Sequence, residues 1–298
     1  MNVYEIVKEN LIAKIEAQIN APKDERTIWY KPWSIVNMPC NHISTRPYHG
    51  INAFMLGGVG SEFLTFKQLK SLQEKDSCIQ LRAKSKGHMV VFFKWLDGKE
   101  TDSETGEEKE SKIPMLRYYK VFNVSDVDGL ELKTASTYEH TAEERESQLN
   151  DVLFNYLHRE GIQTNFTDTG RAFYRPSTDS IDIPKEKYFK HYNRFLDTLA
   201  HEVAHSTGKR LGRKAHQTKG DEAYSYEELV AEFAASLLLA RYGIASEVTE
   251  EQSAAYIASW FNNIKNCPAK LLFNAFTAAE KAANYIMGDN DEEMEDAI

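Results

Sequence analysis

The stretch His201-Glu202-Val203-Ala204-His205 predicts a metal site on a helix. Side chains four residues apart lie one above the other on a helix, so the two histidines can share one ion. Glu202 projects at an angle that keeps it out of the inner coordination shell, which suits a general base. We expect one Zn²⁺ ion, with Mn²⁺ as the alternative. The alternative is a partly exposed helix whose two histidines only cover the hydrophobic core and bind no metal.

Apolar residues at helical spacing precede this motif. Tyr192, Phe195, Leu196 and Leu199 recur upstream, so the histidines belong to an amphipathic helix and not to a loop. Gly208 follows the motif, and we expect it to end the helix as a left-handed cap residue.

A third metal ligand must come from elsewhere in the chain, because catalytic zinc takes three protein ligands and leaves one position for water. A third histidine after the glycine is excluded, since position 211 is a leucine. In the segment 226–233, Glu228 and Glu232 lie four apart amid apolar residues. We expect Glu228 to bind the metal and Glu232 to hold a ligand histidine by its free ring nitrogen. Either acid would also suit solvated surface. The weaker alternatives for the metal are His216 and Asp221.

Length and composition limit the class of protein. The chain has 298 residues, 42% of them hydrophobic, and no apolar run approaches a membrane span. We therefore expect a soluble globular protein with room for two cores and no membrane partner. Charges at Glu5, Lys8 and Glu9 argue against a signal peptide. The three cysteines are far apart and odd in number, which predicts reduced thiols and a cytoplasmic location.

The net charge of −9 conceals a basic region in the first half of the chain. Between Lys23 and Lys94, eleven lysines and arginines outnumber five acids. Aromatic and basic residues alternate nearby, as single-stranded nucleic acid requires: each ring can stack on an unpaired base for about 1–3 kcal/mol, and cations meet the phosphates. The same aromatic residues would equally suit a core contact with the first helix. The candidate DNA-binding residues are Trp29, Tyr30, Lys31, Trp33, Arg46, Tyr48, Arg82, Lys84 and Lys86.

The order of predicted elements indicates an α+β fold. In the first half we expect a helix over 3–19, a short helix capped by Thr65, and strands at 90–96 and 116–124 around an acidic hairpin loop at 97–112. A polar linker at 134–146 divides the chain into domains 1–135 and 136–288, followed by a disordered acidic tail at 289–298.

The second predicted domain places a small sheet before the metal helix. Helix 149–160 and strand 162–166 precede a short strand at 181–184, whose final proline suits an edge strand. A peptide could pair with such an edge and lie across the metal. Three further helices are expected at 226–242, 250–263 and 269–287.

Motifs in both halves resemble one known family. Those of the first half are Pro39, Asn41, Tyr48-His49-Gly50-Ile51-Asn52, Thr65-Phe66-Lys67-Gln68 and Tyr119-Lys120-Val121-Phe122-Asn123-Val124. Those of the second half are Tyr174-Arg175-Pro176, Ile183-Pro184, the His-Glu-x-x-His helix with Ser206-Thr207-Gly208, Arg210-Leu211 and Glu228-Leu229-Val230-Ala231-Glu232. Together they are similar to plasmid antirestriction proteins of the ArdC type.

The resemblance implies an N-terminal mixed α/β domain that binds single-stranded DNA and a C-terminal zincin-like (SprT-like) metallopeptidase domain with a small sheet. Proteins of this type protect incoming plasmid DNA from host restriction. Carried over residue by residue, the family's ligands become His201, His205 and Glu228, with Glu202 as base. The resemblance also favours DNA binding over a core contact for the aromatic residues Trp29, Tyr30 and Trp33. The pair Ser206-Thr207 replaces a larger residue that is often found in the family, so the resemblance does not define the fine shape of the pocket there.

Three functions of different classes follow from the sequence. The first is a DNA-bound metalloprotease acting on an unidentified protein substrate. The second is a single-stranded-DNA-binding protein whose zinc is structural, and the third is a peptidase whose first domain binds a protein partner. For hydrolysis, the candidate oxyanion stabilisers beyond the metal are Tyr192, Tyr224 and Tyr226.

Overall fold

The computed structural model describes residues 2–20, 38–101, 108–133, 140–213, 222–244 and 260–289. Its helices are α1 Val3–Ile19, α2 Ile51–Leu56, α3 Phe66–Gln73, α4 Ala142–Arg159, α5 Tyr192–Arg210, α6 Glu222–Arg241 and α8 Ala269–Met287, with a further helix over 260–266 and short 3-10 turns at Val124–Asp126 and Glu186–Tyr188. Its strands are β1 Cys40–Asn41, β2 Glu62–Thr65, β3 Gln80–Leu81, β4 His88–Thr101, β5 Glu108–Asn123, β6 Val127–Asp128, β7 Gln163–Thr167, β8 Phe173–Arg175 and β9 Ser180–Pro184. The α+β class is confirmed.

Several predicted helices have the expected bounds. α1 spans the 3–19 segment, and α8 spans 269–287. α3 begins after Thr65, whose side chain accepts a hydrogen bond from the backbone of Gln68 in a capping box. The predicted helix 250–263 is described only from residue 260, and the acidic tail lies outside the described residues beyond Asp289.

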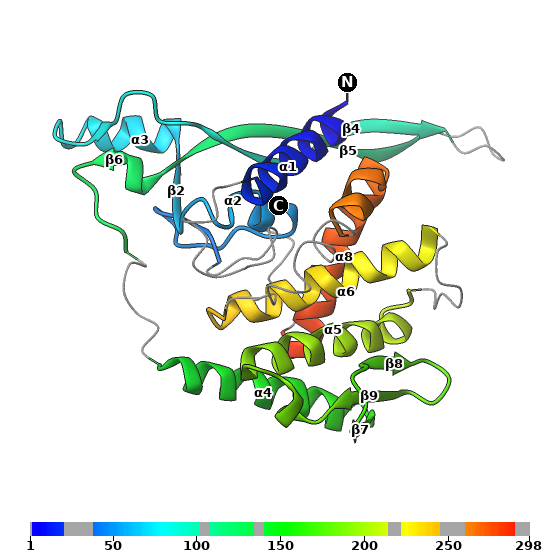
Figure 1. Cartoon of the computed structure of the whole chain (residues 1–298). Coiled ribbons are helices and arrows are strands. Elements are labelled where there is room, and N and C mark those ends of the chain that lie inside the picture. The colour runs from blue at the N-terminus through cyan, green and yellow to red at the C-terminus, as the bar shows by residue number, and fades with distance from the viewer. Residues whose placement is uncertain are drawn as a thin grey trace.

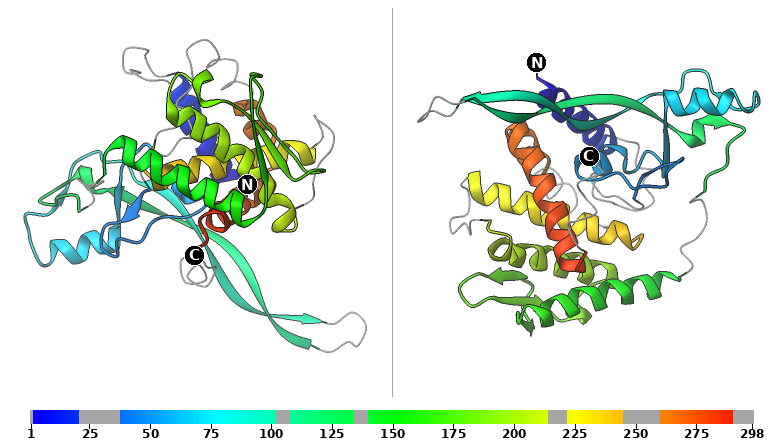
Figure 2. Two further views of the ribbon diagram at one scale, coloured as in Figure 1. Left: turned by 90° about the horizontal axis from the view of Figure 1, so that it is seen from below. Right: turned by 180° about the vertical axis from the view of Figure 1, so that it is seen from behind.

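A long hairpin dominates the N-terminal sheet. The strand order is β1-β2-β5-β4, with β1 parallel to β2 and the other pairs antiparallel. Pairing of β4 with β5 runs from His88 opposite Val121 to Thr101 opposite Glu108, and the hairpin extends away from the helices (Figures 1 and 2). The predicted loop at 97–112 was therefore placed wrongly over paired strands. Backbone pairing does not require apolar residues, and in this register acidic positions lie opposite basic ones, as at Lys99 and Glu110.

The second, three-stranded sheet has the order β7-β9-β8. β9 pairs with β7 in parallel and with β8 antiparallel, so the prediction that 181–184 is an edge strand was wrong. Pro184 is the last residue of β9, where its missing N–H does not prevent a central position, and every residue of the strand is buried. The edge strand that contacts α5 is β8.

The helix α5 continues through Gly208 to Arg210, so the prediction that Gly208 ends it was wrong. A left-handed residue does follow, at Gly212 with φ 68°. Gly208 has a packing role instead: a Cβ atom there would lie 3.3 Å from Oε1 of Glu227 on α6. The absence of a side chain thus lets α5 and α6 approach each other closely.

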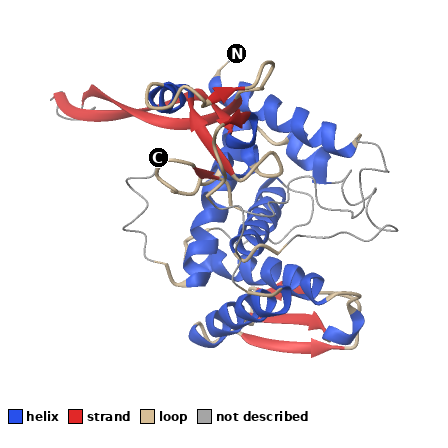
Figure 3. Cartoon of the chain, turned by 90° about the vertical axis from the view of Figure 1, so that its left-hand side faces the viewer, coloured by secondary structure: helices blue, strands red, loops and turns tan. Residues whose placement is uncertain are grey.

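One hydrophobic core joins the two halves of the chain. Figure 1 shows α5, α6 and α8 below the N-terminal elements, and Figure 3 shows helices between the strands at the two ends of the molecule. α8 contacts α1, α2, α4, α5 and α6. Phe54 of α2 lies 5.1 Å from Phe233 of α6 and 4.7 Å from Phe276 of α8, measured between ring centroids. These two rings also stack on each other at 4.1 Å. The hydrophobic core is therefore continuous across the predicted domain boundary.

Candidate metal centre and basic hollows

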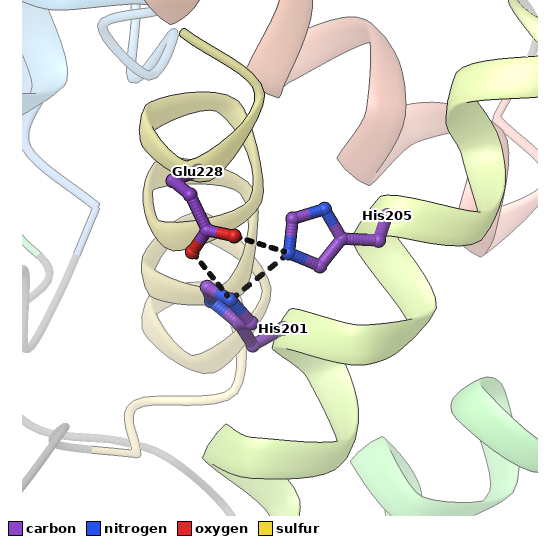
Figure 4. Close-up of side chains that lie close together, drawn as sticks. All are labelled: His201, His205 and Glu228. Atoms are coloured by element: carbon purple, nitrogen blue, oxygen red, sulfur yellow. Dashed lines mark hydrogen bonds and ion pairs between the residues drawn. The ribbon is translucent and has the colours of Figure 1, made fainter. Parts of the chain in front are cut away.

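His201 and His205 lie one turn apart on α5 and point toward Glu228 on α6 (Figure 4). The two Nε2 atoms are 3.1 Å apart, and each lies 3.6 Å from an oxygen of Glu228. All three donor atoms lie within 4.8 Å of one another. Across the described ranges, no other group of three histidine, cysteine or acidic side chains converges in this way.

The spacing of these donors fits one small divalent ion. Zinc–ligand bonds of about 2.0–2.1 Å place two ligands of a tetrahedral ion about 3.3 Å apart. The observed separations of 3.1 and 3.6 Å bracket that value. About a fifth of each ligand side chain is exposed, so the centre is reachable from solvent.

Acidic side chains contact the outer nitrogen of each ring. Oε2 of Glu232, which is almost fully buried, lies 3.4 Å from Nδ1 of His201, where the sequence analysis placed it. Oε1 of Glu227 lies 3.8 Å from Nδ1 of His205. The guanidinium of Arg213 donates to both oxygens of Glu227, at 2.8 and 3.1 Å. Such partners fix the orientation of ligand rings.

Sequence reasoning missed Glu227. It stands next to Glu228 and belongs to the same helical run of acids, but only the tertiary structure shows that it faces the second histidine. Gly208, which contacts Glu227 from α5, could have indicated this position, because a glycine inside a helix often marks the close approach of another element.

The charges around His201 favour its protonated form. Burial lowers the pKa of this ring, but the hydrogen bonds with Glu228 and Glu232 and the charge of Glu202 outweigh it and raise the pKa to about 10. For Glu227, burial raises the pKa, whereas His205 and Arg213 outweigh this effect and lower it. The centre therefore carries excess negative charge that suits a cation.

Glu202 is buried beside the centre and belongs to none of the three donor positions. Its Oε2 accepts a hydrogen bond of 2.7 Å from the backbone N–H of Tyr174 on β8. This contact joins the carboxylate to the edge strand of the small sheet. The candidate base and a strand edge thus lie side by side.

Two of the three candidate oxyanion stabilisers have other partners. The hydroxyl of Tyr192 donates to Asn150, and that of Tyr226 donates to the carbonyl of Asn274. The side chain of Tyr224, like residues His216 and Asp221, lies outside the described part of the structure.

The described candidate DNA-binding residues line two separate hollows near the N-terminal sheet. Arg82, Lys84 and Lys86 line one of about 470 Å³ together with His88. Arg46 and Tyr48 line another, of about 630 Å³. The aromatic run Trp29, Tyr30, Lys31 and Trp33 lies outside the described residues.

Comparison with known proteins gives a match for each half of the chain. Residues 1–122 match the N-terminal domain of the anti-restriction factor ArdC, and residues 154–281 match a zincin-like metallopeptidase family, MPTase-PolyVal. A zincin-like domain implies a metal ion.

Solved structures and a curated relative are similar over nearly the whole chain. The crystal structure of the antirestriction ArdC protein from plasmid R388 in its metal-free form is 32% identical, with a TM-score of 0.67, and the match covers 96% of this chain and 97% of that one. The Mn(II)-bound structure of the same protein is 30% identical, with a TM-score of 0.66, and covers 97% and 98%.

A DNA primase TraC of Escherichia coli is 30% identical over 315 residues, which cover 98% of this chain. The chain spans only 20% of the length of that primase. The likeness to ArdC, in contrast, extends over almost the full length of both chains and includes both matched domains. This chain therefore belongs to the ArdC family of antirestriction proteins.

Proposed function

We propose that this protein binds single-stranded DNA and hydrolyses peptide bonds at a zinc centre, and that it thereby protects incoming plasmid or mobile-element DNA from restriction. The observation that carries the proposal is the convergence of His201, His205 and Glu228, with Glu202 beside them and outside the donor set. A structural zinc site is closed by a fourth protein ligand, whereas a catalytic site has three.

The residues of the centre divide the chemistry among them. Zn²⁺, or the Mn²⁺ that a family member binds, would supply a Lewis acid and lower the pKa of a coordinated water. Glu202 accepts the proton of the attacking water and returns it to the leaving amine. Glu232 and Glu227 hold the two ligand rings in orientation.

The edge strand β8 positions a peptide substrate. Tyr174 directs its N–H away from β9 and toward Glu202, so the backbone groups of this residue lie on the open edge next to the centre. An extended peptide that pairs with this edge would pass directly beside the proposed base. The proposal thus transfers to β8 the role that the sequence suggested for 181–184.

The N-terminal half, which we take to end near residue 135, supplies the DNA-binding surface. Arg82, Lys84 and Lys86 surround one hollow, and the adjacent turn holds Lys84 at a φ of 69°. Clustered cations of this kind neutralise phosphates and bind single strands without strong sequence preference.

Transfer of a plasmid into a restricting host tests whether proteolysis is required. A Glu202→Gln variant should retain its metal but lose protection. Retained protection with bound metal would instead favour the second candidate, a DNA-binding protein whose zinc is structural. A His205→Ala variant serves as the control that removes a metal ligand.

Oligonucleotide binding at about 50 and 200 mM salt tests the DNA part, because affinity that depends on phosphate contacts must fall steeply with salt. Replacing Lys84 and Lys86 with alanine should weaken binding and reduce the salt dependence. If the protein bound no oligonucleotide at either salt concentration, the third candidate, a peptidase whose first domain binds a protein partner, would be favoured.

A further inference from the structure

The larger of the two hollows has features that phosphate binding does not explain. Its volume is about 630 Å³, within the range of pockets that take small organic ligands. Its walls come from the segment 41–52, from Thr65 and Gln68 at the start of α3, from the hairpin strands β4 and β5, and from α8. It therefore lies where the N-terminal sheet meets the helix that also packs on the metal-bearing helices α5 and α6.

Aromatic rings line one part of this cavity. Tyr48, Phe92 and Tyr119 all contribute to it, and the ring centroids of the last two are 5.6 Å apart. Tyr119 is 39% exposed, so part of its ring is open to solvent. Rings presented in this way provide faces on which an unpaired base can stack.

Polar groups with unused hydrogen-bonding capacity lie among these rings. The amides of Asn41 and Gln68 bond to each other reciprocally, at 3.1 Å in both directions. Each amide nitrogen carries a second N–H beyond that bond. The hydroxyl of Tyr48 is buried beside the side chain of Asn41, with which it interacts without reaching the geometry of a full hydrogen bond. A buried hydroxyl with an incomplete hydrogen bond is unfavourable, and a ligand atom would complete its hydrogen bonding.

Two basic side chains lie at the exposed part of the same cavity. Arg46 from the loop and Lys281 from α8 both line it, and both are exposed. They bracket the aromatic and amide groups from two elements far apart in the sequence. A ligand with a flat polar ring and flanking anionic groups matches this arrangement.

We propose that the cavity receives one unstacked nucleobase of a single DNA strand, stacked beside Tyr119 and bonded at its edge by the amides of Asn41 and Gln68, with adjacent phosphates near Arg46 and Lys281. This inference rests on the proposed binding of single-stranded DNA and adds to it a pocket for one base. Nucleobases present carbonyl and ring-nitrogen acceptors on their edges, which suit the two amide donors. A free nucleotide shares this chemistry and is the alternative source.

The hairpin offers a matched pair of variants. Tyr119 and Tyr118 are neighbours on β5 and point to opposite faces of the sheet, with 39% and 46% of their surface exposed. Only Tyr119 lines the cavity. The test measures affinity for a thymidine dodecamer and for an abasic strand of the same length, which has the phosphates but no bases.

Tyr119→Ala should weaken binding of the base-bearing strand about tenfold, because one stacking contact is lost, and should leave binding of the abasic strand unchanged. Tyr118→Ala should change neither. Equal effects of the two variants, or an equal loss on both strands, would overturn the base pocket while leaving phosphate binding intact. Failure of the wild type to bind either strand would overturn both proposals. Thymidine monophosphate binding as tightly as the dodecamer would assign the pocket to free nucleotides.

A second variant separates binding from folding. Tyr48→Phe removes the buried hydroxyl and its interaction with Asn41, which falls short of a full hydrogen bond, so the thermal stability of the unliganded protein should change little. Affinity for the base-bearing strand should fall several-fold. Unchanged affinity, or a loss of stability that accounts for the weaker binding, would overturn the role assigned to this hydroxyl.

Discussion

At the scale of single residues, the metal centre depends on side chains that hold the ligand histidines in orientation. His201 and His205 are each backed by a glutamate, and Glu227 is itself fixed by Arg213. The spacing of the histidines and the buried acids on the next helix were readable from the sequence. Glu227 was not, because the face of α6 that meets α5 depends on how the two helices dock. Helix docking is a tertiary property.

Removing the carboxylate behind His205 should weaken metal binding. A Glu227→Gln variant should bind Zn²⁺ about 10 to 100 times more weakly than the wild type, since an outer partner orients its ligand ring. Competition with a chromogenic chelator measures this affinity. Asp151→Asn, at an exposed position on α4, is the control and should change nothing. Equal affinities of Glu227→Gln and the wild type would show that Glu227 does not support the ligand.

Replacing Gly208 with alanine should lower metal affinity while leaving stability nearly unchanged. Alanine is a better helix former than glycine by about 1 kcal/mol, so Gly208→Ala favours the helix itself. The added methyl group would stand 3.3 Å from Oε1 of Glu227 and must displace it. We expect weaker zinc binding with little loss of thermal stability. Unchanged zinc affinity would mean that Glu227 can move without disturbing His205.

At the scale of elements, the small sheet is held against the metal helix by Arg210 near the end of α5. This guanidinium bonds Glu160 after α4 at 2.7 Å and Asp179 before β9 at 2.9 Å. Asp179 also accepts a hydrogen bond from the hydroxyl of Tyr174 on β8. The edge strand beside Glu202 is thereby fixed to the helix that carries the base.

This connection predicts a pH-dependent stability. Burial raises the pKa of Glu160 and of Asp179, but hydrogen bonds from Arg210 outweigh it and leave both pKa values below their ordinary range. A lowered pKa in the folded state gives stability that is present above the ordinary value, about 4, and is lost as pH falls through the folded value.

Urea unfolding of the wild type and Arg210→Met measures this contribution. The variant should be less stable by about 2 kcal/mol at pH 7, because it removes the guanidinium that pairs with both carboxylates. The difference between the two proteins should shrink as pH falls from 5 to 3. A difference that stays constant over this range would contradict the role of the ion pairs.

The predicted elements differ in how well local sequence determines them. α1 and α8 follow from apolar periodicity and caps, which are local signals. The position of β9 within its sheet depends on which strands pair, and a terminal proline fits both a central and an edge strand. The outer part of the β4–β5 hairpin is polar, so periodicity gave no strand signal there although the backbone pairs.

At the scale of the whole molecule, the two halves share a core, and the described helices include none with the length and apolarity needed to cross a membrane. α8 bridges the halves, and Phe54 packs against both Phe276 of α8 and Phe233 of α6. The division into domains at residue 135 stays a prediction, since residues 134–139 of the predicted linker lie outside the described residues. The end of that predicted linker, 142–146, is helical instead, because α4 begins at Ala142 with Thr141 as its cap. A shared core nonetheless has a thermodynamic consequence.

Phe54→Ala should destabilise the whole chain. Truncating a buried phenylalanine costs about 3–5 kcal/mol, and Phe54 is 2% exposed. We expect one cooperative unfolding transition at a lower temperature, with hydrogen exchange accelerated in both α1 and α8. Phe166→Ala, at a residue that is 48% exposed, is the control. Two separate transitions, only one of them shifted by Phe54→Ala, would show that the halves fold independently.

The most direct measurement of the central claim is hydrolysis of an unfolded protein, such as casein, by wild type and Glu202→Gln loaded with equal amounts of Zn²⁺. If His201, His205 and Glu228 hold the ion while Glu202 moves the proton, both proteins should bind one ion. The variant should then cleave at least about a hundredfold more slowly. Equal cleavage by the two zinc-loaded proteins, or no cleavage by the wild type with one ion bound, would contradict the assignment.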